Sequence, residues 1–234
     1  MTSTKKESTR TLKKKLLAFL QTDDFVHNLD HLRELPARQA VNPLFSFFHH
    51  REPLIRWRAV TSMGIITAFL AETEMESARV IMRRLMWTLN DESGGIGWGS
   101  PEAMGDIMAR SHDLACEFGC ILVSYIREEA NYLEHPVLQR GVLWGLGRLG
   151  HVYPEYMRVA APAFHPFLQS ADPYHRGLAA WAITPLADDN AVPLLEDLTR
   201  DETAIILYTD MRFISTTVAH LAGEALKHLT PIQA

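Results

Sequence analysis

The chain has 234 residues, a formal charge of −5 at pH 7 and a pI near 6.1, with 47% hydrophobic and 22% charged residues. This near-average composition excludes a disordered or fibrous chain. The acidic balance argues against nucleic acid as the main partner, because phosphate binding requires a concentrated basic surface. No run reaches the roughly 18 apolar residues of a membrane span and the N-terminus lacks an apolar signal core, so we expect a cytoplasmic protein without a membrane partner.

The first elements predicted along the chain are two helices. Residues 9–21 place leucines at helical spacing with lysines on the other side, which predicts an amphipathic helix covering the end of the core. Residues 25–35 are predicted to form a second, short helix. We therefore assign residues 1–35 to an N-terminal cap and residues 36–229 to repeats, all within one domain of residues 1–234.

A pair of helices then recurs about five times. A pair of roughly 35–45 residues cannot bury both of its faces alone, so neighbouring pairs stack around a continuous core. The sequence therefore predicts an all-α fold, a right-handed α-solenoid of about five helical hairpins. Prolines that open the second helix of a pair are Pro53, Pro101, Pro136 and Pro173. The predicted pairs are residues 36–49 with 54–70, 77–89 with 101–110, 112–128 with 136–149, 154–168 with 173–186, and 191–198 with 217–229.

Two of the turns carry a family resemblance. Glu52-Pro53-Leu54-Ile55-Arg56 and Asp172-Pro173-Tyr174-His175-Arg176-Gly177-Leu178-Ala179 resemble the Asp-Pro-x-x-Arg-x-x-Ala turn of HEAT repeats. Over residues 36–229 the chain resembles the bacterial phycobilisome-lyase HEAT-like repeat proteins, although Gln139 stands where the third turn should have arginine. The resemblance implies a binding scaffold and no lyase activity. It also implies that Arg56 and Arg176 are structural, donating hydrogen bonds to neighbouring acidic residues.

Two insertions interrupt the repeat. The prolines at 53 and 101 are 48 residues apart, whereas the next two intervals are 35 and 37 residues; the excess is a glycine-rich loop within residues 90–102. Residues 203–216 have β-branched and aromatic residues on both sides of a central turn, which predicts a short β-hairpin. Equivalent turns of a solenoid share one edge, so both insertions should decorate one rim. Such a rim often marks the binding side, although gap filling near the end of the array explains it equally well.

The glycine-rich loop supplies our candidate binding residues. Its carboxylates can accept hydrogen bonds from a cationic or amide ligand, and its tryptophan offers a flat apolar surface. Its glycines permit positive φ or close approach, and can cradle an anion at the start of the next helix. The alternative is that the tryptophan is a hydrophobic plug over the second pair. The candidates are Asp91, Glu92, Gly94, Gly95, Gly97, Trp98 and Glu102.

Other candidate chemistry is weaker. His112, Cys116 and Cys120 recur every four residues and can bind zinc or copper in principle, but no fourth ligand can be named and cysteine is more often buried. Trp144 and Trp181 occupy matching positions, eight residues after Pro136 and Pro173, which is typical of core aromatics. No catalytic motif is present, so we predict no catalytic residue, cofactor or metal.

The sequence thus favours a non-catalytic adaptor module that recognises a protein or peptide through the rim loop and the concave face. One alternative is a small molecule or cofactor bound under the loop of residues 90–102. Another is an enzyme resembling the HEAT-like alkylpurine DNA glycosylases, which the acidic charge disfavours.

Overall fold

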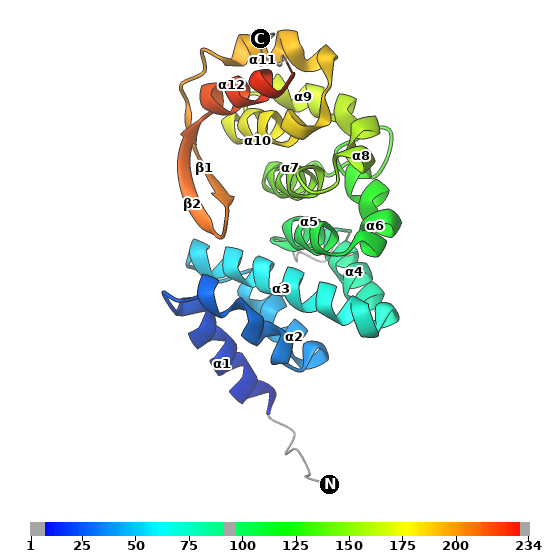
Figure 1. Cartoon of the computed structure of the whole chain (residues 1–234), viewed down its shortest axis with the longest axis vertical. Helices are drawn as coiled ribbons and strands as arrows, with labels where there is room; N and C mark the ends of the chain where they lie inside the picture. The colour runs from blue at the N-terminus through cyan, green and yellow to red at the C-terminus, as the bar shows by residue number, and fades with distance from the viewer. Residues whose placement is uncertain (1–7, 91–96, 230–234) are drawn as a thin grey trace.

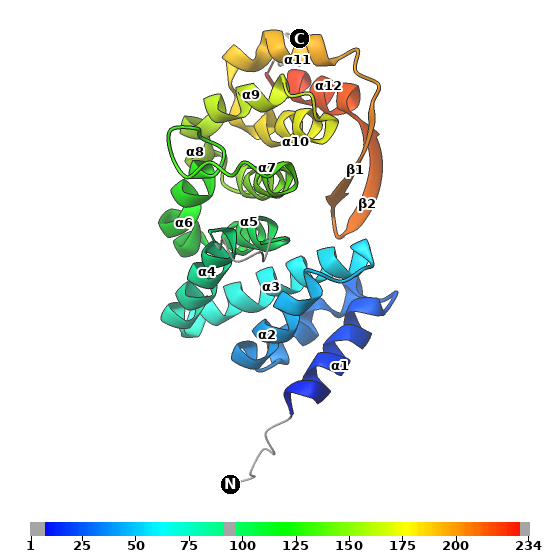
Figure 2. The ribbon, with the colours of Figure 1, turned by 180° about the vertical axis from the view of Figure 1, so that it is seen from behind.

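A computed structural model describes residues 8–90 and 97–229. The helices stack into an arc, and a β-hairpin crosses its inner side from the C-terminal repeats to the first long helix (Figures 1 and 2). The chain opens with α1 (Thr9–Gln21), whose bounds agree with the prediction and whose first turn is capped by the Ser8 hydroxyl. The short helix that follows is the 3-10 helix η1 (Val26–Glu34).

The predicted pairing of helices is confirmed. The second helices of the pairs pack against one another as an inner layer, while α4, α6 and α8 form the outer side of the arc (Figure 1). The pairs are α2 (Ala37–Phe47) with α3 (Pro53–Thr73), α4 (Met75–Leu89) with α5 (Ser100–Arg110), α6 (His112–Ser124) with α7 (Pro136–Gly150), α8 and α9 with α10 (Pro173–Ile183), and α11 (Val192–Leu198) with α12 (Val218–Leu229).

The first helix of the fourth pair differs from the prediction. Instead of one helix over residues 154–168, the chain forms α8 (Pro154–Met157), the 3-10 helix η2 (Arg158–Phe164) and α9 (His165–Leu168). Pro162 and Pro166 lack the N–H that an α-helix needs, and their rings crowd the preceding turn, so the helix breaks there. Two further 3-10 turns, η3 (Thr184–Leu186) and η4 (Asp189–Ala191), connect α10 to α11.

The predicted hairpin is present as β1 (Ala204–Thr209) paired antiparallel with β2 (Arg212–Thr217). Asp210 and Met211 form its turn with φ of 47° and 60°. Positive φ at both central residues is the signature of a type I′ turn, whose twist matches that of the strands. Strands β1 and β2 therefore project together from the helical array as one compact hairpin.

Helix α3 is the longest helix of the described chain and is largely buried. It is the one helix among the described residues that is long and apolar enough to span a bilayer by length and composition, and 78% of its apolar window is buried in the fold. Its buried Arg58 is held by the carbonyl oxygens of Leu20 and Thr22, each at 2.7 Å, and lies 4.9 Å from the Phe25 ring centroid. The apolar composition of α3 is thus explained by its burial in the fold.

Candidate functional site

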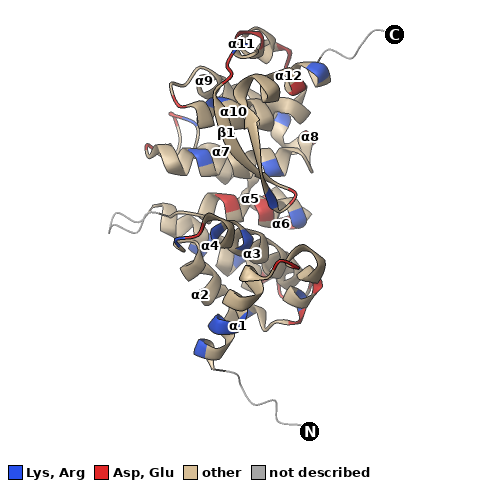
Figure 3. Ribbon diagram, turned by 90° about the vertical axis from the view of Figure 1, so that its left-hand side faces the viewer, with Lys and Arg blue, Asp and Glu red and all other residues tan. Residues whose placement is uncertain are grey.

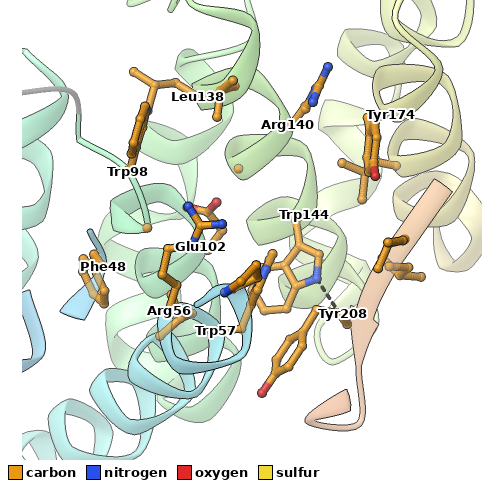
Figure 4. A pocket seen from close by; sticks show the side chains of 18 of the residues that line it. Phe48, Arg56, Trp57, Trp98, Glu102, Leu138, Arg140, Trp144, Tyr174 and Tyr208 are labelled. Atoms are coloured by element: carbon orange, nitrogen blue, oxygen red, sulfur yellow. Dashed lines mark hydrogen bonds between the residues drawn. The ribbon is translucent and has the colours of Figure 1, made fainter. Parts of the chain in front are cut away.

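The hairpin and the inner helices enclose a pocket of about 630 Å³ on the concave face (Figure 4). Its walls come from the N-terminal ends of α3, α5, α7 and α10 and from the strands. Pockets of about 300–1,000 Å³ with apolar walls and few polar groups are typical ligand sites. We call it the aromatic pocket, because its lining includes Phe48, Trp57, Trp98, Trp144, Tyr174, Tyr208 and Phe213.

Ring stacking and two hydrogen bonds fix the hairpin over the helices. The Tyr208 ring stacks on Trp57 with centroids 4.7 Å apart and planes at 20°, and the Trp144 indole N–H donates to the Tyr208 carbonyl oxygen at 2.7 Å. The Tyr208 hydroxyl pairs with Thr61 Oγ1 at 3.2 Å, and burial raises the pKa of Tyr208 to about 12. Trp144 is buried, as predicted for a core residue, and it is also a wall of the pocket. These contacts hold the pocket in shape without a ligand.

The glycine-rich loop reaches the same pocket through its last residues. Trp98 lies at the pocket rim with 37% of its surface exposed, 6.2 Å from the His49 ring. Gly99 has φ of 79°, and a Cβ there would meet the Phe48 ring at 2.8 Å, so both the backbone and the space require glycine. Gly97 is equally restricted, since its Cβ would come within 2.6 Å of the Thr88 carbonyl oxygen.

Of the predicted site residues, the structure thus brings Trp98 and Glu102 to the pocket, while Gly97 supports the backbone beside it. The other four lie outside the described residues: Asp91, Glu92, Gly94 and Gly95. Trp98 is partly exposed at the rim of the pocket. It therefore fits neither the expectation of a fully exposed apolar surface nor the alternative of a fully buried hydrophobic plug.

Glu102 is the acidic group of the aromatic pocket. It lies in the first turn of α5, and its carboxyl group packs against Gly141 of α7, where a Cβ would come within 2.7 Å of the carboxyl atoms. The residue as a whole is half-buried, but Oε2 is covered and has no hydrogen-bond partner within residues 8–90 and 97–229. Burial raises the Glu102 pKa to about 7, although backbone N–H groups and the charge of Arg56 act against the rise.

The arginines of the turns are paired differently from the expectation. Arg176 donates to Asp201 at 2.8 Å, as the HEAT-like pattern implies. In the third turn the arginine of this kind is Arg140, which donates to Asp172 at 2.6 Å. Gln139 is buried beside it. For Arg56 the expected structural pairing is not found among the described residues: its side chain forms no hydrogen bond or ion pair with any of them and lines the pocket, while Asp91 and Glu92 lie outside them.

A second recess, of about 380 Å³, lies on the other side of the hairpin. Buried Asp106 accepts from Arg110 Nε at 2.8 Å and from Arg148 Nε at 3.1 Å. The carboxylate fits because residue 64 is glycine, where a Cβ would lie 2.0 Å from Oδ2. We call this the charged recess. Sequence reasoning missed its centre, although the i, i+4 spacing of Asp106 and Arg110 was a usable signal.

His151 and Trp181 line the charged recess as a stacked pair, with ring centroids 4.9 Å apart. His151 Nε2 lies 3.1 Å from the Trp181 carbonyl oxygen, and burial lowers the pKa of the imidazole. Trp181 also stacks on Trp144 at 6.3 Å, so the two matched tryptophans form one continuous wall beneath the hairpin.

The histidine and cysteines of α6 form a polar surface cluster. His112 Nε2 lies 2.6 Å from the Tyr156 hydroxyl, and Cys116 Sγ lies 3.8 Å from His112 Nδ1. Both cysteines are free and exposed. Within residues 8–90 and 97–229, no group of three histidine, cysteine or acidic side chains has metal-binding geometry.

Comparisons with known proteins place the chain by fold. No family model matches the sequence. A protein from Archaeoglobus fulgidus described as uncharacterized is 22% identical over 182 residues, which cover 77% of this chain and 92% of that protein. A designed armadillo repeat protein in complex with the peptide (KR)4 superposes with a TM-score of 0.53 at 16% identity, covering 92% of this chain and 98% of that one.

A second solved structure, of computationally designed armadillo repeat proteins for modular peptide recognition, gives a TM-score of 0.51 at 16% identity. It covers 95% of this chain and 100% of that one. At these identities the likeness concerns fold alone: the chain is an armadillo-like helical repeat solenoid with a small two-stranded sheet near its C-terminus.

Proposed function

We propose that this protein is a non-catalytic binding module that anchors a peptide segment of a protein partner in the aromatic pocket. The observation that carries the proposal is the pocket itself, which combines about 630 Å³ of space, aromatic walls, a covered Glu102 Oε2 without a partner among the described residues, and an Arg56 side chain that none of these residues pairs. Buried polar atoms without partners are rare in folded proteins, and a ligand supplies what they lack. Concave surfaces of helical repeat arrays are general platforms for such binding.

The hairpin limits how a peptide can lie. In an open solenoid an extended peptide can follow the whole groove, but here β1 and β2 cross the concave face and reach α3 (Figures 1 and 2). We therefore infer that the partner inserts a short anchor from the side of Trp98. The designed armadillo proteins with bound peptide support the general mode and say nothing of this partner's sequence.

The charge distribution supports a protein partner over nucleic acid. Figure 3 shows basic and acidic residues interspersed over the hairpin face, and the formal charge of the chain is −5. A phosphate backbone needs a continuous basic track. Within this proposal we place the protein in the cytoplasm and its repeats in the HEAT-like class that the turns resemble.

Selection of random peptides on the folded protein, followed by titration calorimetry of the best binder, tests the proposal. Trp98→Ala removes an exposed rim ring, and we expect it to weaken binding about tenfold or more, as loss of an aromatic anchor does at interfaces. Trp87→Ala is the matched control, because Trp87 is 72% exposed on α4 and does not line the pocket. Equal binding by the two variants would refute the pocket as the site.

A small molecule is the second candidate occupant, favoured by the volume and the aromatic walls of the pocket. Thermal melting of the protein against a metabolite panel separates the two. A ligand that stabilises the protein at millimolar concentration or below, and whose effect Trp98→Ala removes, would replace the peptide if the selection returned no binder.

A further inference from the structure

Among the described residues, Arg56 has no aspartate partner of the kind that its two counterparts have. The two paired arginines each donate to an aspartate in the turn that follows, one of which directly precedes the proline that opens α10. The residue before the proline that opens α5 is Ser100, which is buried and pairs with Thr88 Oγ1 at 2.8 Å instead. Half-buried Arg56 therefore presents its guanidinium to the aromatic pocket (Figure 4).

Glu102 extends into the same part of the pocket as Arg56 (Figure 4). The two groups interact electrostatically, but no hydrogen bond or ion pair within 4.0 Å joins them. The covered Oε2 has no partner in the part of the chain that the structure describes, and the raised pKa of Glu102 means that the neutral acid is well populated near pH 7. A neutral carboxyl group offers one O–H donor, which the protein leaves unused.

The charges of the pocket decide between a cationic and an anionic ligand. When Glu102 is protonated, Arg56 is the uncompensated charge among the described lining residues, because Asp172 neutralises Arg140. An arginine and a protonated carboxyl group can both donate to a common acceptor. A carboxylate has only acceptors, neutralises one positive charge and forms strong charge-assisted hydrogen bonds with guanidinium.

We propose that the aromatic pocket binds a free carboxylate carried by an aromatic or branched apolar group, with Arg56 and Glu102 as its hydrogen-bond donors and the rings of Trp57 and Trp144 against its apolar part. This inference rests on the proposed binding function and names the group that the pocket recognises. The C-terminal residue of a peptide and a small aromatic acid share this chemistry.

Matched ligand pairs that differ only in charge test the proposal by calorimetry. The small pair is phenylpropionate and phenylpropionamide; the peptide pair is an acetylated tetrapeptide that ends in phenylalanine, with a free or an amidated C-terminus. We expect the acid of a pair to bind about tenfold or more tightly than its amide, which is the effect of one hydrogen bond to a charged group. Preference for the free peptide over the small acid identifies a chain terminus as the source, and the reverse preference identifies a small molecule.

Arg56→Gln should remove the preference for acid over amide. Arg51→Gln, which makes the same charge change at a side chain that is 89% exposed, should keep it. Glu102→Gln keeps an N–H donor, so we expect it to retain binding of the acid. It should lose the pH dependence of the wild type, whose affinity falls as Glu102 loses its proton on passing through about pH 7.

Three results would overturn the inference. Equal binding of acid and amide would show that the pocket reads shape alone, and the binding function would stand. Tighter binding of phenylpropylamine, with affinity rising with pH, would show that ionised Glu102 recognises a cation. Failure of all these probes, while selected peptides still bind in a Trp98-dependent way, would also reject carboxylate recognition and leave the proposed function intact.

Discussion

The hairpin separates two recesses that treat their polar groups in opposite ways. In the charged recess one buried carboxylate, Asp106, satisfies two arginines, and the group is complete without a ligand. In the aromatic pocket Arg56 and Glu102 share a wall without bonding to each other. Buried polar groups whose hydrogen bonds are satisfied within the protein stabilise the fold. Buried polar groups whose hydrogen bonds are not satisfied are candidates for ligand binding.

The largest effect should follow from breaking the charged recess. Asp106→Asn leaves two converging guanidinium groups without a counter-charge, and we expect a loss of about 3 kcal/mol in the free energy of unfolding. Chemical denaturation measures it. Asp113→Asn, at a side chain that is 74% exposed, is the control and should change stability by less than about 0.5 kcal/mol. Equal effects of the two variants would mean that Asp106 does not hold the fold.

Gly64→Ala perturbs the same recess by a steric clash. The added Cβ would lie 2.0 Å from Asp106 Oδ2, so the carboxylate must move away from its arginines, at a cost of about 2 kcal/mol. Gly223→Ala is the opposite case, since nothing lies within 4 Å of its added Cβ. There we expect a gain of about 0.5 kcal/mol from helix propensity. A neutral Gly64→Ala variant would show that the recess adapts easily.

The aromatic pocket should respond to pH, with a definite sign. Glu102 has a folded-state pKa of about 7, above the ordinary value of 4.5, so the folded protein binds the proton more tightly. Its stabilising contribution is complete below pH 4.5 and is lost as pH rises through about 7, at up to about 1.4 kcal/mol per pH unit.

Glu102→Gln removes this proton. Between pH 5 and pH 7 the variant should therefore gain about 2 kcal/mol in stability relative to the wild type, measured by urea denaturation at each pH. Glu128→Gln, at an exposed residue, should run parallel to the wild type. A constant difference between the wild type and Glu102→Gln would contradict the burial of this carboxyl group.

The smallest effect is expected from a substitution that removes the partner of Arg140, so that Arg140 resembles Arg56. Asp172→Ser removes the charge that Arg140 contacts but keeps a side chain able to cap α10. We expect a loss of about 0.5–1 kcal/mol that shrinks at high salt, since the Arg140 side chain is 37% exposed. A loss that does not depend on salt would point to the cap and not to the ion pair.

The repeat architecture was readable from sequence because prolines mark helix starts by local chemistry. Pro53, Pro136 and Pro173 open their helices as predicted, and the alternation around Thr209 correctly indicated a hairpin. The break at Pro162 was also readable and was missed, since the same backbone rule applies within a helix.

The site was only partly predictable. Trp98 and Glu102 were selected for their place in an unusual loop, and they do reach a pocket. The partners around them come from segments as far along the chain as the β-hairpin, more than 100 residues away, and their meeting depends on the curvature of the array. Arg140 makes the contact expected of the turn arginine, although the pattern placed that arginine at Gln139. A shift of one residue along the helix was enough to hide this in the sequence. Among the described residues Arg56 is left unpaired where Ser100, a residue in the next repeat, stands in place of an aspartate, so a local pattern could not reveal it.

The hairpin has a consequence for how the chain folds. In a simple repeat array each unit contacts only its neighbours, so the array can fray from either end. Here Tyr208 bonds to Thr61, 147 residues earlier, which ties the last repeat to the first long helix. A closed loop of this length slows folding because the ends must meet before the contact forms. Once formed, it makes the terminal repeats cooperative, and we expect the array to melt in one transition.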